Sequence, residues 1–371
     1  MRQALGLFGV RLSAILALAV SAALFVDYTN TLPAFCGADS GCAAVRRSGF
    51  GYVVLFGWPV PVPVFGMLGF ALLLGVALTR ELRRWVPLVA AVGGAAALGL
   101  FGLQAFKIKH LCSLCVTVDL LAVLAALAGG VLWKGKTADA NDDFALRWAA
   151  WPVLSVLAVS APLLWPRLRP APPVPAGVLK LYQPGKINVV EFADYECPFC
   201  RGLHPQLKAV IASYPGKVHF TRLNLPLHSH EFAQVAAEAQ VCAREQNKGD
   251  EMGDLLFAAD DLRPPANRLL AQGLGLDLIA YDRCIASGRA DSTIEAESKI
   301  LIDNGLQGLP TTFVGAKTIV GLQAEEVFRD AFDHAERGEG ESGIPAPAYW
   351  LTVLALAGAV IWVGRLRRAT L

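Results

Sequence analysis

Long apolar segments constrain the fold of this chain more than any other feature of its sequence. A helix that crosses a bilayer needs about 20 predominantly apolar residues, and five or six segments approach or exceed that length. They lie at about residues 7–26, 52–78, 86–106, 111–133, 144–165 and 349–363. Hydrophobic residues make up 54% of the chain and charged residues only 17%, an apolar excess that needs lipid as well as a core. We therefore expect a membrane protein with several spanning helices.

Lys and Arg residues predict how these segments are oriented, because short cytoplasmic loops are enriched in both. Six spans with both chain ends inside would place Arg2, the turn at 80–84, Lys134, Lys136 and the final arginines in the cytoplasm. Several cations fall on the other side, namely Arg46, Arg47, Lys107, Lys109, Arg167 and Arg169. On this topology every cysteine pair lies outside the cytoplasm or at the outer edge of the membrane.

Both end segments have a second interpretation. The first could be a signal peptide that is cleaved near Ala22, since small residues mark such sites. The last is followed by Arg365, Arg367 and Arg368, and so also resembles a bacterial C-terminal sorting signal that is removed. We expect both segments to be retained as membrane helices.

The eight cysteines fall into pairs. Three pairs are close in sequence and one is distant: Cys36 with Cys42, Cys112 with Cys115, Cys197 with Cys200, and Cys242 with Cys284. Disulfides persist in oxidising compartments, so this arrangement predicts redox chemistry on the extracytoplasmic side. The net charge is only +2, and the sequence has no basic stripe interleaved with aromatic residues. Nucleic acid is therefore not expected as a partner.

Beyond a Pro-rich segment at 167–177, the composition becomes that of a soluble domain. Val178–Tyr182 and Ile187–Ala193 are typical of strands, and a helical pattern follows Cys197 as far as Ala212. A Cys-x-x-Cys at a strand-to-helix junction is the thioredoxin arrangement. A helix N-terminus favours the thiolate, which is the nucleophile in disulfide exchange. Cys197 is therefore predicted to attack a disulfide or be attacked by a thiol, and Cys200 to resolve the mixed disulfide that results.

Further motifs in this domain resemble the DsbA-like branch of the thioredoxin superfamily. The resemblance implies that Glu191 assists proton transfer beneath the active site and that Pro310, in Gly308–Val314, forms a cis peptide bond that faces the cysteines. Ser229–Gly288 has the period of a helical insertion. In that context the resemblance implies a structural Cys242–Cys284 disulfide, with two buried free thiols as the alternative. A zinc half-site at Cys197 and Cys200 lacks a second pair with metal-like spacing, so no metal is expected.

The membrane part resembles the vitamin K epoxide reductase family over about residues 7–133. One Cys pair follows the first span and the other opens the fourth span. The supporting residues are Ser48, the Phe56–Pro59 turn, Gly66 and Gly69. A thioredoxin-like domain joined by a fifth span matches the known bacterial fusion. The expected fold is a multidomain membrane protein, with an all-α four-helix bundle and an α/β thioredoxin-like domain that carries a helical insertion.

The resemblance implies a relay of electrons to a quinone, either ubiquinone or menaquinone. Reduced exported proteins would reduce the Cys197–Cys200 disulfide, and that pair would then reduce the loop pair, Cys36 and Cys42. Cys42 would exchange with Cys112, and Cys115, deepest in the bundle, would face the quinone. The alternatives are a static disulfide for the loop pair and mere helix packing for the pair in the bundle.

Quinone contacts match the family only in part. Ser48 falls where the family has a Ser or Thr near the quinone. The vertebrate members of the family carry an Asn on the second span, where this chain has Pro61-Val62-Pro63. They also carry a Tyr one turn after the Cys pair, where this chain has Asp119. These departures argue against epoxide reduction and leave quinone reduction in place. An acid inside a span is a functional candidate, so Asp119 is predicted either to protonate quinone or to pack between helices.

The expected domains are the bundle at 1–138, the fifth span at 139–166, the linker at 167–177, the DsbA-like domain at 178–338 and a last span with a basic tail at 345–371. The predicted activity is quinone-dependent disulfide formation at a bacterial cytoplasmic membrane, with the soluble domain outside. A membrane-tethered reductase or isomerase is one rival function. A non-enzymatic module that binds metal or client proteins through its thiols is another.

Overall fold

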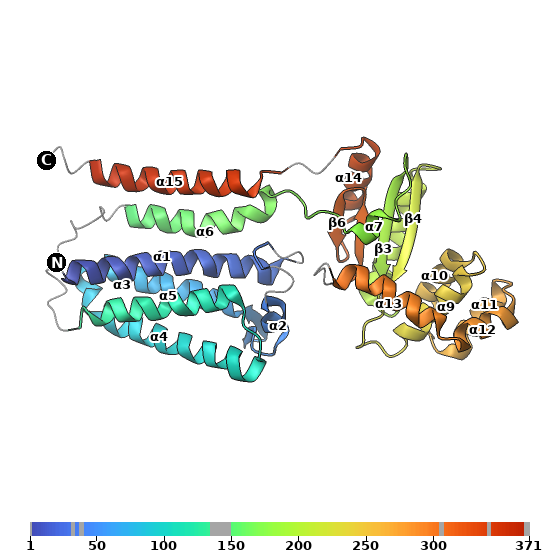
Figure 1. Cartoon of the computed structure of the whole chain (residues 1–371), viewed down its shortest axis with the longest axis horizontal. Helices are drawn as coiled ribbons and strands as arrows, with labels where there is room; N and C mark the ends of the chain where they lie inside the picture. The colour runs from blue at the N-terminus through green and yellow to red at the C-terminus, as the bar shows by residue number, and fades with distance from the viewer. Residues whose placement is uncertain are drawn as a thin grey trace. The chain divides into compact units, whose positions relative to one another are not determined.

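A computed structural model describes residues 2–30, 34–36, 41–133, 150–303, 308–339 and 343–366. The chain divides into two compact units. The first, called the membrane unit, combines Met1–Arg169 with Ile344–Leu371, and the second, called the soluble unit, is Pro170–Gly343. Figure 1 shows the helices of the membrane unit side by side and the sheet of the soluble unit with its helices.

Helix α1 (Arg2–Thr29) is the centre of the membrane unit and packs against three other helices. These are α3 (Val62–Leu78), α5 (Ser113–Gly130) and α6 (Ala150–Leu168). Helix α4 (Val86–Gly102) packs against α5, and α15 (Ala346–Leu366) packs against α6. The shared core is mainly apolar, with Val10, Ala14, Ala77 and Val86 fully buried, and the buried Arg11 donates to the carbonyl of Ala77.

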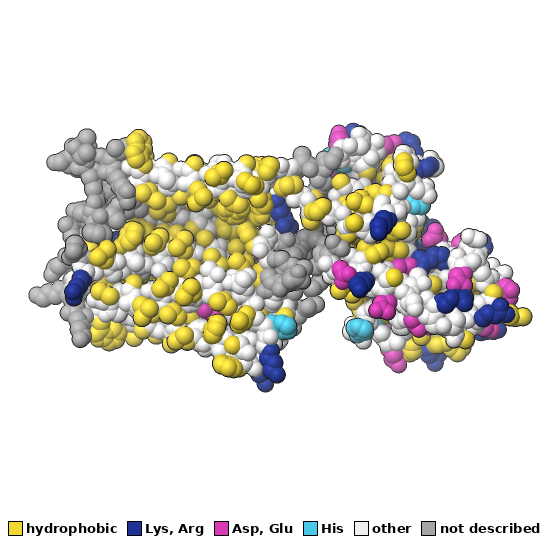
Figure 2. All heavy atoms as spheres, in the orientation of Figure 1, with side chains coloured by type: hydrophobic (Ala, Val, Ile, Leu, Met, Phe, Trp, Pro, Cys, Tyr) yellow, Lys and Arg dark blue, Asp and Glu magenta, His cyan; other side chains and the backbone are white. Residues whose placement is uncertain are grey.

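Among the described residues, five helices are long and apolar enough to cross a membrane. They are Arg2–Thr29, Arg80–Ile108, Ser113–Gly130, Ala150–Leu168 and Ala346–Gly364. Helix α3 has 17 residues and is shorter. Figure 2 shows hydrophobic side chains spread over the outside of these helices, as lipid-facing surfaces require. Five of the six predicted membrane segments are therefore confirmed as helices of suitable length and composition.

The predicted second span at residues 52–78 is wrong in its first part. Strands β1 (Tyr52–Leu55) and β2 (Trp58–Pro61) form an antiparallel hairpin, and α3 begins only at Val62. Phe56 and Gly57 both have positive φ, as a two-residue hairpin turn requires. Proline lacks the N–H that a helix interior needs but is tolerated in the first helical turn, which explains why the helix starts beside Pro63.

Two short helical segments flank α4, and one small helix lies in the first loop. They are η1 (Arg80–Trp85), the π-helical turn η2 (Leu103–Ile108) and α2 (Cys42–Arg47). The predicted fifth span at residues 144–165 differs at its end, and its start is untested. Residues 144–149 lie outside the described part of the chain, and α6 continues to Leu168.

The soluble unit is built on a four-stranded sheet in the order β4–β3–β5–β6. Strand β3 (Ile187–Ala193) is parallel to β4 (Val218–Asn224) and antiparallel to β5 (Thr311–Val314), which pairs with β6 (Lys317–Val320). Helices α8 (Pro198–Ala212) and α14 (Glu325–Glu336) share a core with the sheet. All residues of β3 are buried, as expected for a central strand.

A helical insertion separates β4 from β5, as predicted. It consists of α9 (Ala233–Arg244), α10 (Gly249–Ala258), α11 (Pro264–Gly273), α12 (Leu278–Ala286) and α13 (Arg289–Ile302). These helices enclose a second core that also contains Cys197 and Cys200. The thioredoxin-like fold with a helical insertion is therefore confirmed.

The strand predicted at Val178–Tyr182 is wrong. The chain there forms one helical turn, α7 (Ala176–Leu179), followed by a turn. The N–H groups of Val178 and Leu179 both donate to the carbonyl of Pro175. Because Pro is pre-organised to begin a helical turn, the proline segment imposes this conformation on a sequence whose apolar residues suggest a strand.

Candidate active site

Three of the four cysteines of the membrane unit are buried together at one end of the bundle. Cys36, Cys42 and Cys112 pack with Leu24 and Val45 in one apolar cluster. Cys115 borders that cluster and is half-buried. Residues far apart in sequence, from the first loop and from the start of α5, thus form one sulfur-rich site. The sulfur atoms of Cys36, Cys42 and Cys112 are thereby shielded in a largely apolar cluster.

The sulfur atoms are placed for thiol–disulfide exchange. Cys36 and Cys42 form a disulfide, whereas Cys112 and Cys115 are thiols. The Sγ of Cys112 lies 2.9 Å from the Sγ of Cys42. Exchange proceeds by attack of a thiolate on one sulfur of a disulfide, and this distance places the Cys42 sulfur in contact with that of Cys112. The family resemblance implied exchange between these two cysteines, and the structure brings their sulfur atoms into contact.

Gly41 brings the loop pair to the bundle. It is the residue before α2 and has φ +68°, which glycine adopts without steric cost. A Cβ at this position would lie 2.4 Å from the carbonyl oxygen of Leu111. The loop backbone therefore touches the backbone that immediately precedes Cys112. This close approach places Cys42, the first residue of α2, against the Cys112 sulfur.

Cys112 occupies the N-cap of α5. Its Sγ accepts a hydrogen bond from the Cys115 N–H at 3.3 Å, and the free N–H groups of a helix start favour the thiolate there. The peptide N–H of Cys112 donates to Gln104 Oε1 at 3.2 Å, and Gln104 Nε2 donates to Asp119 at 3.2 Å. Gln104 and Asp119 are both buried. The structure thus connects Asp119 to the cysteine pair through Gln104, a residue that the sequence did not single out.

Asp27 holds the segment that leads to Cys36. Its carboxylate, which is buried at the end of α1, accepts hydrogen bonds from three consecutive peptide N–H groups. The donors are Ala34 at 2.6 Å, Phe35 at 3.2 Å and Cys36 at 2.7 Å. Charge-assisted bonds of this kind are stronger than neutral ones. In the sequence, Asp27 is distinguished only as an acid at the edge of a predicted span.

Ser48 lies at the end of α2, six residues after Cys42. Its hydroxyl donates to the carbonyl of Val45 at 2.6 Å, and the side chain is half-buried. The hydroxyl oxygen can still accept a hydrogen bond. Its predicted contact with a quinone stays a prediction.

In the soluble unit, Cys197 occupies the N-cap of α8 and Cys200 lies in its first turn. Both are thiols and both are buried. A hydrogen bond from Cys200 lowers the pKa of Cys197 to about 6, and the peptide N–H groups of Cys200 and Phe199 act in the same direction against burial. The same hydrogen bond, together with burial, raises the pKa of Cys200. Cys197 is therefore the thiol that reacts at neutral pH.

Two other predicted features lie in the same unit. The Leu309–Pro310 peptide bond is cis, and Leu309 packs against the core cluster that contains both active cysteines. Cys242 on α9 and Cys284 on α12 form a disulfide. This bond joins two helices of the insertion and lies within the same core cluster.

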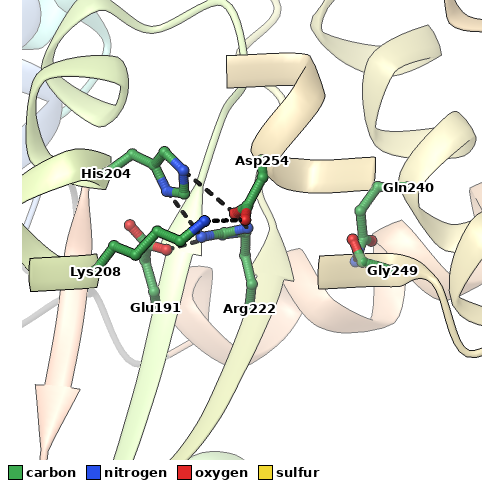
Figure 3. A network of polar contacts seen from close by, with 7 residues as sticks. All are labelled: Glu191, His204, Lys208, Arg222, Gln240, Gly249 and Asp254. Carbon is green, nitrogen blue, oxygen red and sulfur yellow. Dashed lines mark hydrogen bonds and ion pairs between the residues drawn. The ribbon is translucent and has the colours of Figure 1, made fainter. Parts of the chain in front are cut away.

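Glu191 lies on β3, fully buried, and its charge is balanced by an arginine that the sequence analysis missed. Arg222 of β4, which is adjacent in the sheet, donates from Nε to Glu191 at 2.9 Å. Arg222 Nη2 also donates to His204 Nδ1 at 3.1 Å, and His204 Nε2 lies 3.2 Å from Asp254. Figure 3 shows this network, with Lys208 also reaching Asp254.

The protonation of His204 follows from this geometry. Burial and the nearby Arg222 charge lower the pKa of His204, so its ring is neutral at pH 7. A neutral ring has one donor and one acceptor nitrogen. Nδ1 accepts from Arg222, so Nε2 carries the proton and lies 3.2 Å from Asp254. The network therefore links the buried acid beneath the cysteine pair to a half-exposed carboxylate.

Comparison with known proteins matches each unit to a different family. The vitamin K epoxide reductase family matches residues 4–129, and a thioredoxin family matches residues 185–334. Both are families of thiol–disulfide oxidoreductases. The matches cover the two cysteine pairs of the membrane unit and the Cys197–Cys200 pair.

Curated relatives match parts of the chain. The sodium/proton antiporter NhaA 3 of Salinispora tropica is 31% identical over 216 residues, which is 54% of this chain and 33% of that protein. NhaA 1 of Salinispora arenicola is 28% identical and covers 60% of this chain and 36% of that protein. The chain thus spans about a third of the length of these curated relatives.

Two solved structures resemble part of the chain. A thioredoxin-like oxidoreductase from Silicibacter pomeroyi DSS-3 is 25% identical, with 41% of this chain and 88% of that chain covered and a TM-score of 0.38. BdbD from Bacillus subtilis is 19% identical, with 46% and 100% covered and a TM-score of 0.40. From the two family matches and the described fold, the chain contains a vitamin K epoxide reductase family domain at residues 4–129 and a thioredoxin family domain with a helical insertion at residues 185–334.

Proposed function

We propose that this protein is a membrane thiol–disulfide oxidoreductase that forms disulfides in exported proteins and passes the electrons to a quinone. The observation that carries the proposal is the 2.9 Å contact between the sulfur atoms of Cys42 and Cys112. Static disulfides do not need a third sulfur at this distance. A relay does, because exchange passes through a mixed disulfide between the two pairs.

The exchange between the pairs has two steps. When Cys36 and Cys42 are reduced and Cys112 and Cys115 form a disulfide, the Cys42 thiolate attacks Cys112. A Cys42–Cys112 bond forms and Cys115 leaves as a thiolate. The Cys36 thiolate then attacks Cys42, the Cys36–Cys42 bond forms, and Cys112 leaves as a thiolate. Two electrons have moved from the loop to the bundle, and the arrangement of bonds that results is the one in the structure.

The residues around Cys115 fit a quinone as electron acceptor. The site combines an apolar environment with two buried polar side chains, Gln104 and Asp119, the second of which lies one helical turn after Cys115. A bound quinone would supply an acceptor for two electrons and two protons. Cys115 would face it, Asp119 would hold a proton near it, and Gln104 would keep Asp119 in place. These residues suit ubiquinone and menaquinone alike.

The thioredoxin-like pair supplies the other end of the relay. A soluble dithiol cannot enter the bilayer and a quinone does not leave it, so the loop pair Cys36–Cys42 serves as the intermediate. A reduced exported protein would attack the Cys197–Cys200 disulfide, and the resulting dithiol would reduce the loop pair. An acidic Cys197 suits this role, because a stable thiolate makes its disulfide a better oxidant.

This function requires a bacterial cytoplasmic membrane with the soluble unit on the extracytoplasmic side. Two rivals differ in testable ways. A tethered reductase or isomerase would use the soluble pair without quinone. A metal-binding module would use the thiols of Cys36, Cys42 and Cys112, whose sulfur atoms lie within 4.8 Å of one another, but two of them form a disulfide. The antiporter names describe relatives of which this chain covers about a third, so no ion transport is proposed.

Trapping the mixed disulfide tests the exchange. In the full-length variant with Cys36→Ser and Cys115→Ser, neither the resolving thiol of the loop nor that of the bundle remains. Mild oxidation should then link Cys42 to Cys112, which mass spectrometry of a non-reduced digest detects. The matched control carries Cys42→Ser and Cys115→Ser. It should link Cys36 to Cys112 far less, because Cys42 is the sulfur in contact with Cys112. Equal linkage in the two variants would contradict the proposed route.

A further inference from the structure

The segment between β4 and α9, residues 225–232, is tied to the residues around Cys197. The peptide N–H of Leu227 donates to Asp194 at 2.8 Å, and that of Phe232 donates to Glu196 at 2.8 Å. His230 Nδ1 lies 2.8 Å from the same Asp194 oxygen. We call residues 225–232 the clamp loop. These three contacts fall on acidic side chains that lie just before the reactive cysteine, and the Leu225 N–H also donates to the carbonyl of Ala193 at 2.9 Å.

Asp194 is the centre of these contacts. It is buried, with 1% of its surface exposed. Its other carboxylate oxygen accepts hydrogen bonds from the peptide N–H groups of Glu196 at 2.7 Å and Cys197 at 3.2 Å. These bonds shape the turn that presents Cys197 to α8. The hydrogen bond from Cys200 lowers the pKa of Cys197, and the negative charge of Asp194 acts in the opposite direction, against the thiolate. The turn therefore depends on the Asp194 carboxylate, although the negative charge of that carboxylate destabilises the Cys197 thiolate.

His230 is placed to balance that charge. Partial burial of the ring favours its neutral form, but the hydrogen bond to Asp194 and the negative charges of Asp194, Cys197 and Glu196 outweigh it. The pKa of His230 is raised as a result. The two residues between the active cysteines, Pro198 and Phe199, carry no charge. The clamp loop therefore supplies a cation at this end of the active site, in addition to Arg201, whose Nε donates to the carbonyl of Tyr195 at 2.8 Å.

We propose that His230 is a positioning residue for Cys197: it pairs with Asp194, whose carboxylate binds the Cys197 peptide N–H, and offsets the charge of that carboxylate. The pair lets Asp194 shape the turn without suppressing the thiolate. This role deepens the proposed function, on which it rests, because it explains how an uncharged Pro-Phe dipeptide can accompany a reactive thiol. It also assigns a task to a residue outside every motif of the sequence.

The expected pH dependence follows from the charges that face His230, which are Asp194, Glu196 and Cys197. Below the raised pKa of His230 the ring is positive, and Asp194 is compensated. As the pH rises through that pKa the ring loses its proton and the compensation is lost. Removing the ring charge should thus matter most near the Cys197 pKa of about 6 and should have no effect at alkaline pH.

The test measures the rate at which Cys197 is alkylated as a function of pH. Reduced full-length protein in detergent is treated with iodoacetamide, and the Cys197 peptide is quantified by mass spectrometry. His230→Gln should shift the midpoint to higher pH and slow alkylation several-fold near pH 6. His230→Lys, which restores a positive charge, should return the midpoint toward that of the unmodified protein. His228→Gln changes an exposed histidine of the same loop and should have no effect.

Two results would overturn the proposal. An unchanged midpoint in His230→Gln would show that the ring charge does not act on Cys197. An equal shift in His230→Gln and His230→Lys would show that the ring acts through packing alone. If Cys197 failed to exchange disulfides in the unmodified protein, the proposed function would fail, whereas the alkylation midpoints would still decide the role of His230.

Discussion

Replacing Gly41 with alanine is expected to separate the loop pair from the bundle pair. An L residue with this left-handed φ costs about 1–2 kcal/mol, which alone is roughly a tenfold change in population. The new Cβ would also lie 2.4 Å from the carbonyl oxygen of Leu111, and a backbone oxygen cannot move aside as a flexible side chain can. The Cys42–Cys112 linkage in the trapping background should therefore fall by a factor of about 10 or more.

The matched control for this variant is Gly49→Ala. Gly49 lies in the same loop, where a Cβ would meet no atom within 4 Å and where φ is not in the left-handed region. Its linkage yield should equal that of the parent. If Gly41→Ala kept the full yield, the close approach of the loop to Leu111 would not determine the position of Cys42.

Removing the arginine beneath the soluble active site should have the largest effect on stability. Arg222→Met leaves Glu191 as a buried carboxylate without its partner, since both side chains are almost completely buried. Breaking one side of a buried ion pair typically costs about 3–5 kcal/mol. The free energy of unfolding of the soluble unit should fall by about that amount, as measured by pulse proteolysis of the full-length protein in urea.

Two further variants separate the charge from the packing. Adding Glu191→Gln to Arg222→Met removes the unpaired charge and should recover part of the loss. Arg329→Met breaks an exposed pair with Glu325 and should have little effect, because surface ion pairs contribute little. A loss in the double variant as large as in Arg222→Met would assign the effect to packing alone. Tryptophan fluorescence cannot replace proteolysis here, since all tryptophans lie outside residues 170–343.

Local sequence signals predicted the elements whose pattern is strong. Long apolar runs predicted the helices of the membrane unit, and the Cys-x-x-Cys after an apolar run predicted both β3 and α8. Prolines caused the two errors. Pro59 and Pro61 lie in a hairpin rather than a span, and Pro175 starts a helical turn where Val178–Tyr182 suggested a strand.

The contacts of the candidate site do not follow from local patterns, because they join residues distant in sequence. Arg222 pairs with Glu191 across 31 positions. Cys112 touches Cys42 across 70 positions, and only the family resemblance pointed to that pairing. Asp27 acts through the peptide segment that it binds, and His230 acts through the Asp194 side chain. Neither residue belongs to a sequence motif. Such residues become visible only when the fold brings their partners to them.

The central claim is that electrons travel from protein thiols through the two cysteine pairs to quinone. The most direct test adds a reduced, unfolded protein to the purified full-length chain in detergent and follows quinone absorbance and free thiols together. We predict that each quinone reduced accompanies the loss of one pair of thiols, and that Cys115→Ser abolishes both. Thiol loss without quinone reduction, or quinone reduction that survives Cys115→Ser, would contradict the relay.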